Sequence, residues 1–479
     1  MKTIVCGAPN ARADMTVAYA PMGAYIPGLD FSLDKKPRKI RGVESSGMMC
    51  SAKELDCGED SDGIMDLDAG LKLGTPLADA LDLNDPVIDF EVTPNRPDWL
   101  GVDSIARDLA AVGLGTVKTK AIKPVKGSFP CPVKITTEVP EACPAFVGRV
   151  VKGVKNGPSP EWLQNQLKAI GLRPISALVD ITNFITYDRA RPLHFYDVSK
   201  LKGGITVKFP DDSVYVDVPP ITENEDEHWR KTKDNLDQDT KWAFMSLDGN
   251  PYWPSSKDVV ICDESGILGL GGIVGGTSTG CDEGTTDILI EAAYFDPLTI
   301  RRSAKRLGVN SDAKYRFERG VDTGFLMGGM ELATQMVLDI CGGEASDVVV
   351  AGDIPMPPPS IKFDTALNER LTGLKLSDKE MSKILTDLGF TVAKDWTVDV
   401  PTWRRDATEG ADLVEEIARI HGFHNLEAVS LPPLPGRREP TATLTQNRTR
   451  LARRALAARG LSEAITWSFV LQDLSLIHI

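Results

Sequence analysis

The sequence lacks the features of a secreted, membrane-spanning or zinc-binding protein. No apolar run is long enough to cross a bilayer, and the first residues, MKTIVCGAPN, show no signal-peptide pattern. The eight cysteines form no CxxC pair, and the five histidines do not join them at the spacing of a zinc site. We therefore expect reduced thiols in a cytoplasmic protein that does not contact a membrane.

Positive charge is also in short supply. The net charge of −14 argues against bulk attraction to nucleic acid, so any RNA binding must use local basic patches. The 42% hydrophobic and 25% charged residues are ordinary for a globular protein. A chain of 479 residues is too long for one core, which predicts two to four domains.

The pattern along the chain predicts an α+β protein of several domains. Residues 1–84 alternate short apolar stretches with turn residues, which is typical of a small β-barrel, here without its first strands. The remaining predicted parts are a connecting helix and linker (85–132), a mixed α/β domain (133–354) with an acidic inserted loop (217–241), a helical and hairpin module (355–432), and the start of a further domain (433–479). The last six residues, LSLIHI, continue no pattern.

Two helix starts carry recognisable signals. Ser377 and Glu380 form a predicted capping box, because hydroxyl and carboxylate can each accept from a free amide of the first turn. Near residue 100, Asp98 or Asp103 is expected to cap the connecting helix.

A basic cluster lies within the predicted barrel. Its members are Lys35, Lys36, Arg38, Lys39 and Arg41. Such a cluster fits a solvated loop as well as a phosphate-binding surface, and charge alone does not decide between them.

One stretch combines a double-glycine loop with a lone acidic residue on an apolar strand. Residues 288–290 predict a strand that leads into Glu291, with Ala292 beside it. A carboxylate there is costly to bury unless a polar group meets it, so we expect a site. The loop glycines, which let the backbone turn or approach a ligand closely, are Gly271, Gly272, Gly275 and Gly276. They match neither a dinucleotide fingerprint nor a P-loop.

A second stretch, residues 177–194, holds further polar candidates. Residues 177–181 predict a buried strand that ends in Thr182 and Asn183. These side chains either face a ligand or cap the next turn, which is their commoner role. His194 is by default a hydrogen-bonded core histidine, and no Ser/His/Asp or Cys/His order indicates a nucleophile.

The third constellation is acidic. Asp412, Glu415 and Glu416 are spaced to share one helix face, and Asp406 lies just upstream. Like charges this close oppose one another. The helix dipole accounts for Asp412 and less well for the two glutamates. A basic partner surface or a Mg²⁺ ion, which prefers oxygen ligands, would neutralise all of them.

Taken together, the motifs resemble those of bacterial phenylalanyl-tRNA synthetase beta chains. The resemblance extends in order from residue 1 to about residue 470. The motifs that carry it are VCGAPN (5–10), ESSGMMCS (44–51), VTPNRPDWLG (92–101), VDITNF (179–184), PLHFYD (192–197), GGIVGG (271–276), LIEAAYFDP (289–297), YRFERGVD (315–322) and PTWRRDATEGADLVEEIARIHGF (401–423).

The resemblance implies a tRNA-binding domain of OB type at the N-terminus and a middle domain that edits tRNAPhe mischarged with tyrosine. Glu291 would accept the tyrosine hydroxyl that phenylalanine lacks, and His194 would help position a water. The other residues implied in the editing pocket are Thr182, Asn183, Gly271, Gly272, Gly275, Gly276 and Ala292. The resemblance also implies a Mg²⁺ shared with an alpha chain at Asp406, Asp412, Glu415 and Glu416.

In the same family, ATP-dependent transfer of phenylalanine occurs in the alpha chain of an α₂β₂ ligase. We therefore expect this chain to bind tRNAPhe and to edit, not to aminoacylate alone. The chain departs from the family pattern in its inserted loop and in stopping early, and it resembles a beta chain truncated at both ends. Two rivals remain: a free-standing deacylase and a non-catalytic RNA-binding scaffold.

Overall fold

The computed structural model describes residues 2–58, 60–81, 83–84, 86–118, 121–210, 244–355, 357–428, 430 and 440–465. The chain divides into two compact units, Met1–Phe423 and His424–Ile479. The predicted acidic insertion and the final six residues lie outside the described part. None of the described helices has the length and apolarity needed to cross a membrane.

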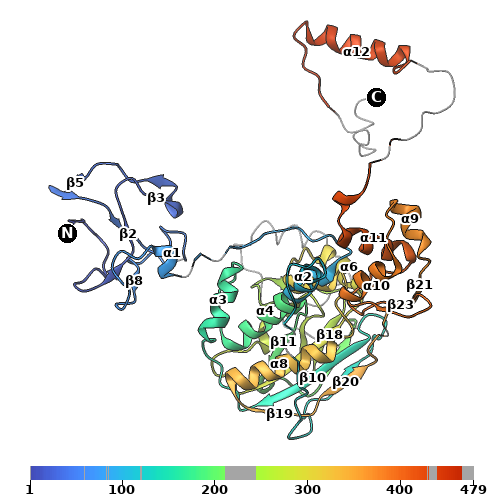
Figure 1. The fold of residues 1–479 in the computed structure, drawn as a ribbon. Helices are drawn as coiled ribbons and strands as arrows, with labels where there is room; N and C mark the ends of the chain where they lie inside the picture. Colours follow the sequence, from blue (N-terminus) through green and yellow to red (C-terminus); the bar gives the residue numbers. More distant parts are fainter. Residues whose placement is uncertain are drawn as a thin grey trace, which may run out of the picture. The chain divides into compact units, whose positions relative to one another are not determined.

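The N-terminal residues 2–81 form pairs of very short strands (Figure 1). The strands pair as β1 with β8, β2 with β7, β3 with β4, and β5 with β6. Their bounds are β1 (Thr16–Val17), β2 (Tyr19–Ala20), β3 (Tyr25–Ile26), β4 (Phe31–Ser32), β5 (Arg38–Ile40), β6 (Val43–Ser45), β7 (Met48–Met49) and β8 (Asp66–Leu67), with a 3₁₀ turn η1 at Pro27–Leu29. A small core holds Ala20, Ile26 and Cys50. No closed barrel forms among the described residues here, so the predicted barrel is not confirmed.

The connecting segment is mostly helical. It comprises α1 (Leu77–Ala80), the 3₁₀ turn η2 (Pro97–Leu100) and α2 (Val102–Ala111). The expected cap is wrong: Gly101 occupies the N-cap of α2, and no side chain caps it. Asp98 instead accepts two hydrogen bonds from Arg96, at 3.0 and 2.9 Å.

Two five-stranded sheets make up the central part. In the first, the order is β11-β18-β10-β19, with β20 also paired to β10, and in the second it is β17-β16-β15-β12-β9. The strands are β9 (Ile135–Thr137), β10 (Ala145–Lys152), β11 (His194–Asp197), β12 (Ile205–Lys208), β15 (Val260–Asp263), β16 (Gly266–Leu270), β17 (Val274–Gly275), β18 (Asp287–Tyr294), β19 (Glu344–Ala345) and β20 (Val349–Gly352), and a separate pair is β13 (Phe244–Met245) and β14 (Pro251–Tyr252).

Helices cover one face of the first sheet, where α8 lies beside β10 (Figure 1). The helical elements of this part are α3 (Glu161–Ala169), α4 (Ala177–Arg189), η3 (Val198–Lys200), η4 (Thr277–Thr279), α6 (Pro297–Leu307), α7 (Asp312–Phe317) and α8 (Leu326–Cys341). Strand residues alternate between two cores, because successive side chains point to opposite faces. On β18, Ile290 and Ala292 pack with the helices, whereas Leu289 and Ala293 belong to the other core.

The predicted strand at residues 177–181 is wrong, because these residues begin α4. A short apolar run does not distinguish a buried strand from a buried helix. Leu178, Ile181 and Ile185 recur at helical spacing and are fully buried against the sheet. The longer pattern therefore sets the secondary structure, and the polar residues that follow lie inside a helix.

The helical and hairpin module has a core of its own, which includes Phe390, Val398 and Leu413. A three-stranded sheet has the order β21-β23-β22. The elements are β21 (Ile361–Lys362), α9 (Ala366–Thr372), α10 (Asp378–Asp387), β22 (Thr391–Val392), β23 (Thr397–Asp399) and α11 (Gly410–His421), followed by η5 (Phe423–Asn425). The second unit contains α12 (Leu444–Ala457). The predicted capping box of Ser377 and Glu380 is confirmed at the start of α10.

Substitution of this cap tests the contribution of local sequence to the module. We expect Ser377→Ala to lower the free energy of unfolding by about 1 kcal/mol, because the Glu380 amide loses the side-chain hydroxyl that accepts its hydrogen bond. Urea denaturation followed by circular dichroism measures the change. The neighbouring exposed Lys379→Ala is the control and should stay within about 0.5 kcal/mol of the parent. Equal effects of both substitutions would contradict a capping role.

Candidate active site

A small cavity lies between the two central sheets. Its volume is about 130 Å³, comparable to the roughly 150 Å³ of an engineered cavity that binds benzene. Strands of both sheets and α7 contribute its walls. Apolar side chains dominate, among them Ile261, Leu270, Ile273 and Phe317, and the titratable groups are His194, Tyr196 and Glu291. A mostly apolar cavity with few convergent polar groups is typical of a ligand site.

Glu291 lies in the middle of β18 and is 7% exposed. The sequence placed it at the end of a strand, but β18 continues to Tyr294. Its carboxylate accepts a hydrogen bond from the Tyr196 hydroxyl at 2.5 Å. Burial raises the pKa of Glu291 to about 7, although this hydrogen bond acts in the opposite direction. The carboxyl group therefore titrates close to neutral pH.

His194 lies directly across from Glu291 in the β11–β18 ladder. Its Nε2 atom is buried and has no hydrogen-bond partner among the described residues. His194 is therefore not the fully hydrogen-bonded core histidine that its sequence context predicts by default. Burial lowers the pKa of His194 to about 4, so the imidazole is neutral at physiological pH. A neutral, unpartnered ring nitrogen of a residue that lines a cavity can accept a hydrogen bond from a ligand or a water.

Only two of the four predicted glycines line this cavity, namely Gly272 and Gly275. A Cβ atom on Gly275 would lie 2.5 Å from Cε1 of His194, so the missing side chain lets the imidazole ring rest on the backbone. Gly271 and Gly276 serve packing instead. Their Cβ atoms would meet Phe295 at 2.7 Å and the Leu268 carbonyl oxygen at 2.6 Å.

Three other predicted pocket residues lie away from the cavity lining. Thr182 and Asn183 are on α4, which packs on the opposite face of the first sheet, and the Thr182 hydroxyl donates to the Val179 carbonyl at 2.7 Å. Ala292 follows Glu291 directly and therefore faces the helices. Sequence reasoning missed Tyr196. Its place two residues after His194 on one strand was the available signal.

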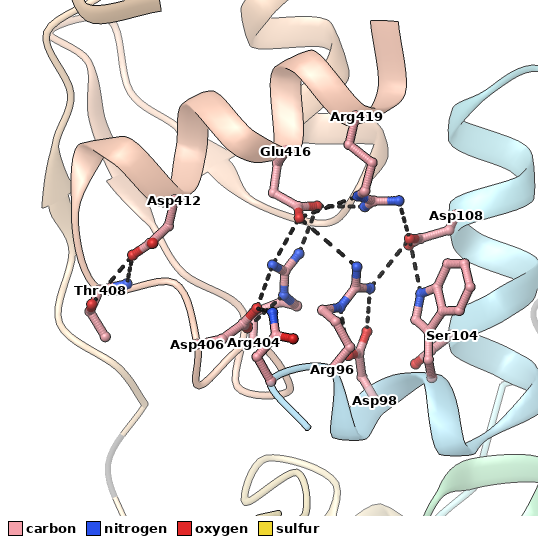
Figure 2. A network of polar contacts seen from close by, with 12 residues as sticks. Arg96, Asp98, Ser104, Asp108, Arg404, Asp406, Thr408, Asp412, Glu416 and Arg419 are labelled. Atoms are coloured by element: carbon pink, nitrogen blue, oxygen red, sulfur yellow. Dashed lines mark hydrogen bonds and ion pairs between the residues drawn. The ribbon is translucent and has the colours of Figure 1, made fainter. Parts of the chain in front are cut away.

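Two of the four predicted acidic residues, Asp406 and Glu416, form ion pairs with arginines (Figure 2). Glu416 is 1% exposed and forms ion pairs with Arg404 and Arg419, at 2.7 and 2.6 Å. Asp406 accepts two hydrogen bonds from Arg404, at 2.8 and 2.9 Å. Burial alone would raise the pKa of Glu416, but the two arginines lower it to about 2. The network extends to the connecting segment through Arg96, Asp98 and Asp108.

Asp412 and Glu415 do not join this network. Asp412 lies apart beside Thr408 in Figure 2 and accepts from the Thr408 and Glu409 amides, at 2.7 and 2.9 Å. It completes a capping box of α11, as the dipole interpretation allowed. Glu415 is exposed, whereas its neighbour Glu416 is buried. Among the described residues of this chain, no group of three or more histidine, cysteine or acidic side chains is placed to hold a metal. The Mg²⁺ site shared with an alpha chain stays a prediction.

The basic cluster is exposed near and on the β5–β6 hairpin. Arg41 and Gly42 form its two-residue turn with φ of 51° and 85°. Positive φ at both positions is typical of a type I′ hairpin turn. All five predicted cations, Lys35, Lys36, Arg38, Lys39 and Arg41, are solvent-exposed. They are free to meet an anionic surface.

Comparison with known proteins finds three family matches. The "Putative tRNA binding domain" matches residues 1–76, the "B3/4 domain" residues 142–342, and the "tRNA synthetase B5 domain" residues 361–423. The cavity lies within the second match, and the arginine–carboxylate network extends into the third.

Curated relatives cover almost the whole chain. The phenylalanine–tRNA ligase beta subunits of Rhodopseudomonas palustris and Bradyrhizobium diazoefficiens are 49% and 48% identical over 470 residues, or 98% of this chain. The chain spans about half of their length, 55% in each case. A solved N-terminal fragment of the phenylalanyl-tRNA synthetase beta subunit from Pyrococcus horikoshii matches with a TM-score of 0.34 at 16% identity, covering 68% of this chain and 84% of the fragment. That structural match carries no argument.

Removal of one arginine tests how far the buried network stabilises the fold. We expect Arg404→Ala to lower the free energy of unfolding by about 3–5 kcal/mol, because Glu416 would lose a main partner while remaining buried. Urea denaturation at pH 7 measures the loss. The effect should persist above pH 4.5 and fade as the pH falls toward 2, because the folded-state pKa of Glu416 is depressed.

The control breaks an exposed ion pair of the same module. Lys383→Ala, which removes the partner of Asp387, should change stability by less than about 1 kcal/mol. Similar losses in the two variants would show that burial of Glu416 does not matter.

If Asp412 only caps α11, its substitution should lower the stability of the fold, and Mg²⁺ should not change that stability. We expect Asp412→Ala to cost about 1 kcal/mol, whereas Glu415→Ala changes little. Thermal unfolding with excess EDTA and with millimolar Mg²⁺ should give the same melting temperature for the parent chain. A rise in melting temperature with Mg²⁺ that Asp412→Ala abolishes would instead support Mg²⁺ binding at Asp412.

Proposed function

The chain belongs to the family of phenylalanine–tRNA ligase beta subunits, of whose length it spans about half, and we propose that it binds tRNAPhe and hydrolyses the ester of tRNAPhe mischarged with tyrosine. Tyrosine and phenylalanine differ by one ring hydroxyl. The editing site must therefore recognise that hydroxyl and release the amino acid only when it is present.

One observation carries the proposal: a buried carboxylate faces a cavity whose size suits one aromatic ring. The cavity of about 130 Å³ is mostly apolar, and Glu291 supplies an acceptor within it. A tyrosyl hydroxyl can donate to this carboxylate. A phenylalanyl ring would leave it without that partner, and sites built to bind a hydroxyl discriminate strongly against analogues that lack it.

Hydrolysis requires a water that attacks the ester carbonyl carbon and breaks its bond to the tRNA 3′-terminal ribose oxygen, which leaves with a proton. His194 lines the cavity and has a buried Nε2 without a hydrogen-bond partner among the described residues, so it is the candidate to accept a hydrogen bond from this water. Its lowered pKa makes it a weak base, so orientation of the water is its main expected contribution. Gly275 provides the space in which the imidazole lies.

The N-terminal residues are proposed to bind tRNA. Their match to a tRNA-binding domain and the exposed cations on the β5–β6 hairpin support this assignment. The OB-type description of this region also belongs to the proposal. Contacts would be to phosphates, since lysine and arginine on an otherwise acidic chain give a local rather than a global attraction.

The proposal extends to the assembled enzyme. An alpha chain would supply ATP-dependent aminoacylation in an α₂β₂ ligase in the cytoplasm. Mg²⁺ would then serve that complex, and no step assigned to this chain depends on it. Hydrolysis by this chain without a partner would favour the deacylase alternative, whereas tRNA binding without hydrolysis would favour the scaffold.

The decisive experiment compares hydrolysis of tyrosyl-tRNAPhe and phenylalanyl-tRNAPhe by the purified chain with and without an alpha subunit. We expect a preference for the tyrosyl ester, and Glu291→Gln should reduce that preference about 10- to 100-fold, the equivalent of one hydrogen bond to a charged group. Release of labelled amino acid measures both rates. Exposed Glu283→Gln, in the same domain, is the control and should behave as the parent. Equal hydrolysis of both esters by the parent would refute the editing assignment.

A further inference from the structure

Tyr196 is a buried side chain that the editing proposal leaves without a role. It is 1% exposed and belongs to the core between the two sheets. Its hydroxyl donates to Oε2 of Glu291 at 2.5 Å. No other described side chain donates a hydrogen bond to the Glu291 carboxylate, so among the described residues Oε1 receives no side-chain hydrogen bond.

Strand geometry fixes this contact. Tyr196 lies opposite Leu289, and His194 lies opposite Glu291, in the antiparallel β11–β18 ladder. Residues two apart on a strand share a face, so Tyr196 is the diagonal neighbour of Glu291. The Tyr196 ring also meets the His194 ring edge to face, with centroids 4.4 Å apart. The phenol is therefore held between the imidazole and the carboxylate.

We propose that Tyr196 is a positioning residue of the editing site: its hydroxyl orients the Glu291 carboxylate and favours its ionised form, and the second oxygen receives the ring hydroxyl of the substrate. This inference rests on the proposed function. Tyr196 itself does not touch the scissile ester. It acts through Glu291, and it determines how strongly the site rejects a ring without a hydroxyl.

The charge state of Glu291 matters because a neutral carboxyl group is much cheaper to leave unpaired than a carboxylate. A protonated Glu291 would tolerate a phenylalanyl ring, and discrimination would fall. The titratable groups around it are His194 and Tyr196 on β11, and Cys143 just before β10, while Cys262 on β15 acts on Tyr196. No lysine or arginine contacts this carboxylate among the described residues. Tyr196 is therefore the group that opposes protonation, and its own raised pKa keeps it a donor.

The test is the pH dependence of Tyr196→Phe. In the parent, discrimination should rise as Glu291 ionises, near pH 7. Removal of the hydroxyl takes away the interaction that lowers the pKa of Glu291. The midpoint should therefore move to higher pH by about one unit, the scale of one hydrogen bond to a charged group. Tyr252→Phe is the matched control, because Tyr252 is buried and donates to a different carboxylate, Asp248, at 2.8 Å.

Two readouts follow the midpoint. The first is the ratio of tyrosyl to phenylalanyl ester hydrolysis across pH. The second is the infrared band of the protonated Glu291 carboxyl group in the full chain, assigned by its absence in Glu291→Gln. The infrared titration does not depend on activity. If the parent shows no tyrosyl preference at any pH, the editing proposal fails, while the infrared midpoint still decides the role of Tyr196.

An unchanged or lower midpoint in Tyr196→Phe, or an equal shift in Tyr252→Phe, would overturn the inference. If Tyr196→Phe does not fold, a fluorotyrosine placed at position 196 replaces it. The fluorinated phenol is a stronger donor, so the midpoint should then move to lower pH. No movement with this substitution would also overturn the inference.

Discussion

The free-energy cost of removing a carboxylate from water governs both polar centres of this chain. Glu416 meets that cost with guanidinium groups, and its pKa falls to about 2. Glu291 has one phenol as its partner, and its pKa rises to about 7. The same functional group is therefore a permanent anion in one module and a titrating group in another. Charge partners make the first a structural element. In the described part of the chain no charged side chain pairs with the second, which leaves it available for a ligand.

Much of the site could be predicted from sequence, because an acidic residue on an apolar strand is unusual by itself. Glu291, His194, Gly272 and Gly275 meet at one cavity, as the resemblance implied. The capping box at Ser377 was also predictable, since it depends on residues three positions apart. Interactions between residues that are close in the chain can be recognised from the sequence. The N-terminal residues are a partial exception, because short alternating stretches indicated strands but not whether their edges would close into a barrel.

The errors arose where distant packing decides the outcome. Residues 177–181 taken alone fit a strand as well as a helix, and the helical spacing becomes visible only when Ile185 and the packing of α4 against the sheet are included. Ala292 was placed in the pocket by adjacency to Glu291, although strand alternation turns it to the opposite face. In the acidic constellation, Arg404 and Arg419 lie close to Glu416 in sequence and could have been recognised as its partners, whereas the approach of Arg96 could not be seen.

A second long-range contact, between the same two segments, constrains how the chain reaches its fold. Asn95 and Asp406 lie within hydrogen-bond distance although they are 311 positions apart. The interaction closes a loop that contains the entire central pair of sheets. Loop-closure entropy opposes such a contact until the enclosed segment is compact. The contacts that join Arg96 and Asp108 to Glu416 and Arg419 should therefore form late, after the central sheets, whereas the pairs that Glu416 makes with Arg404 and Arg419 are local in sequence and can form earlier.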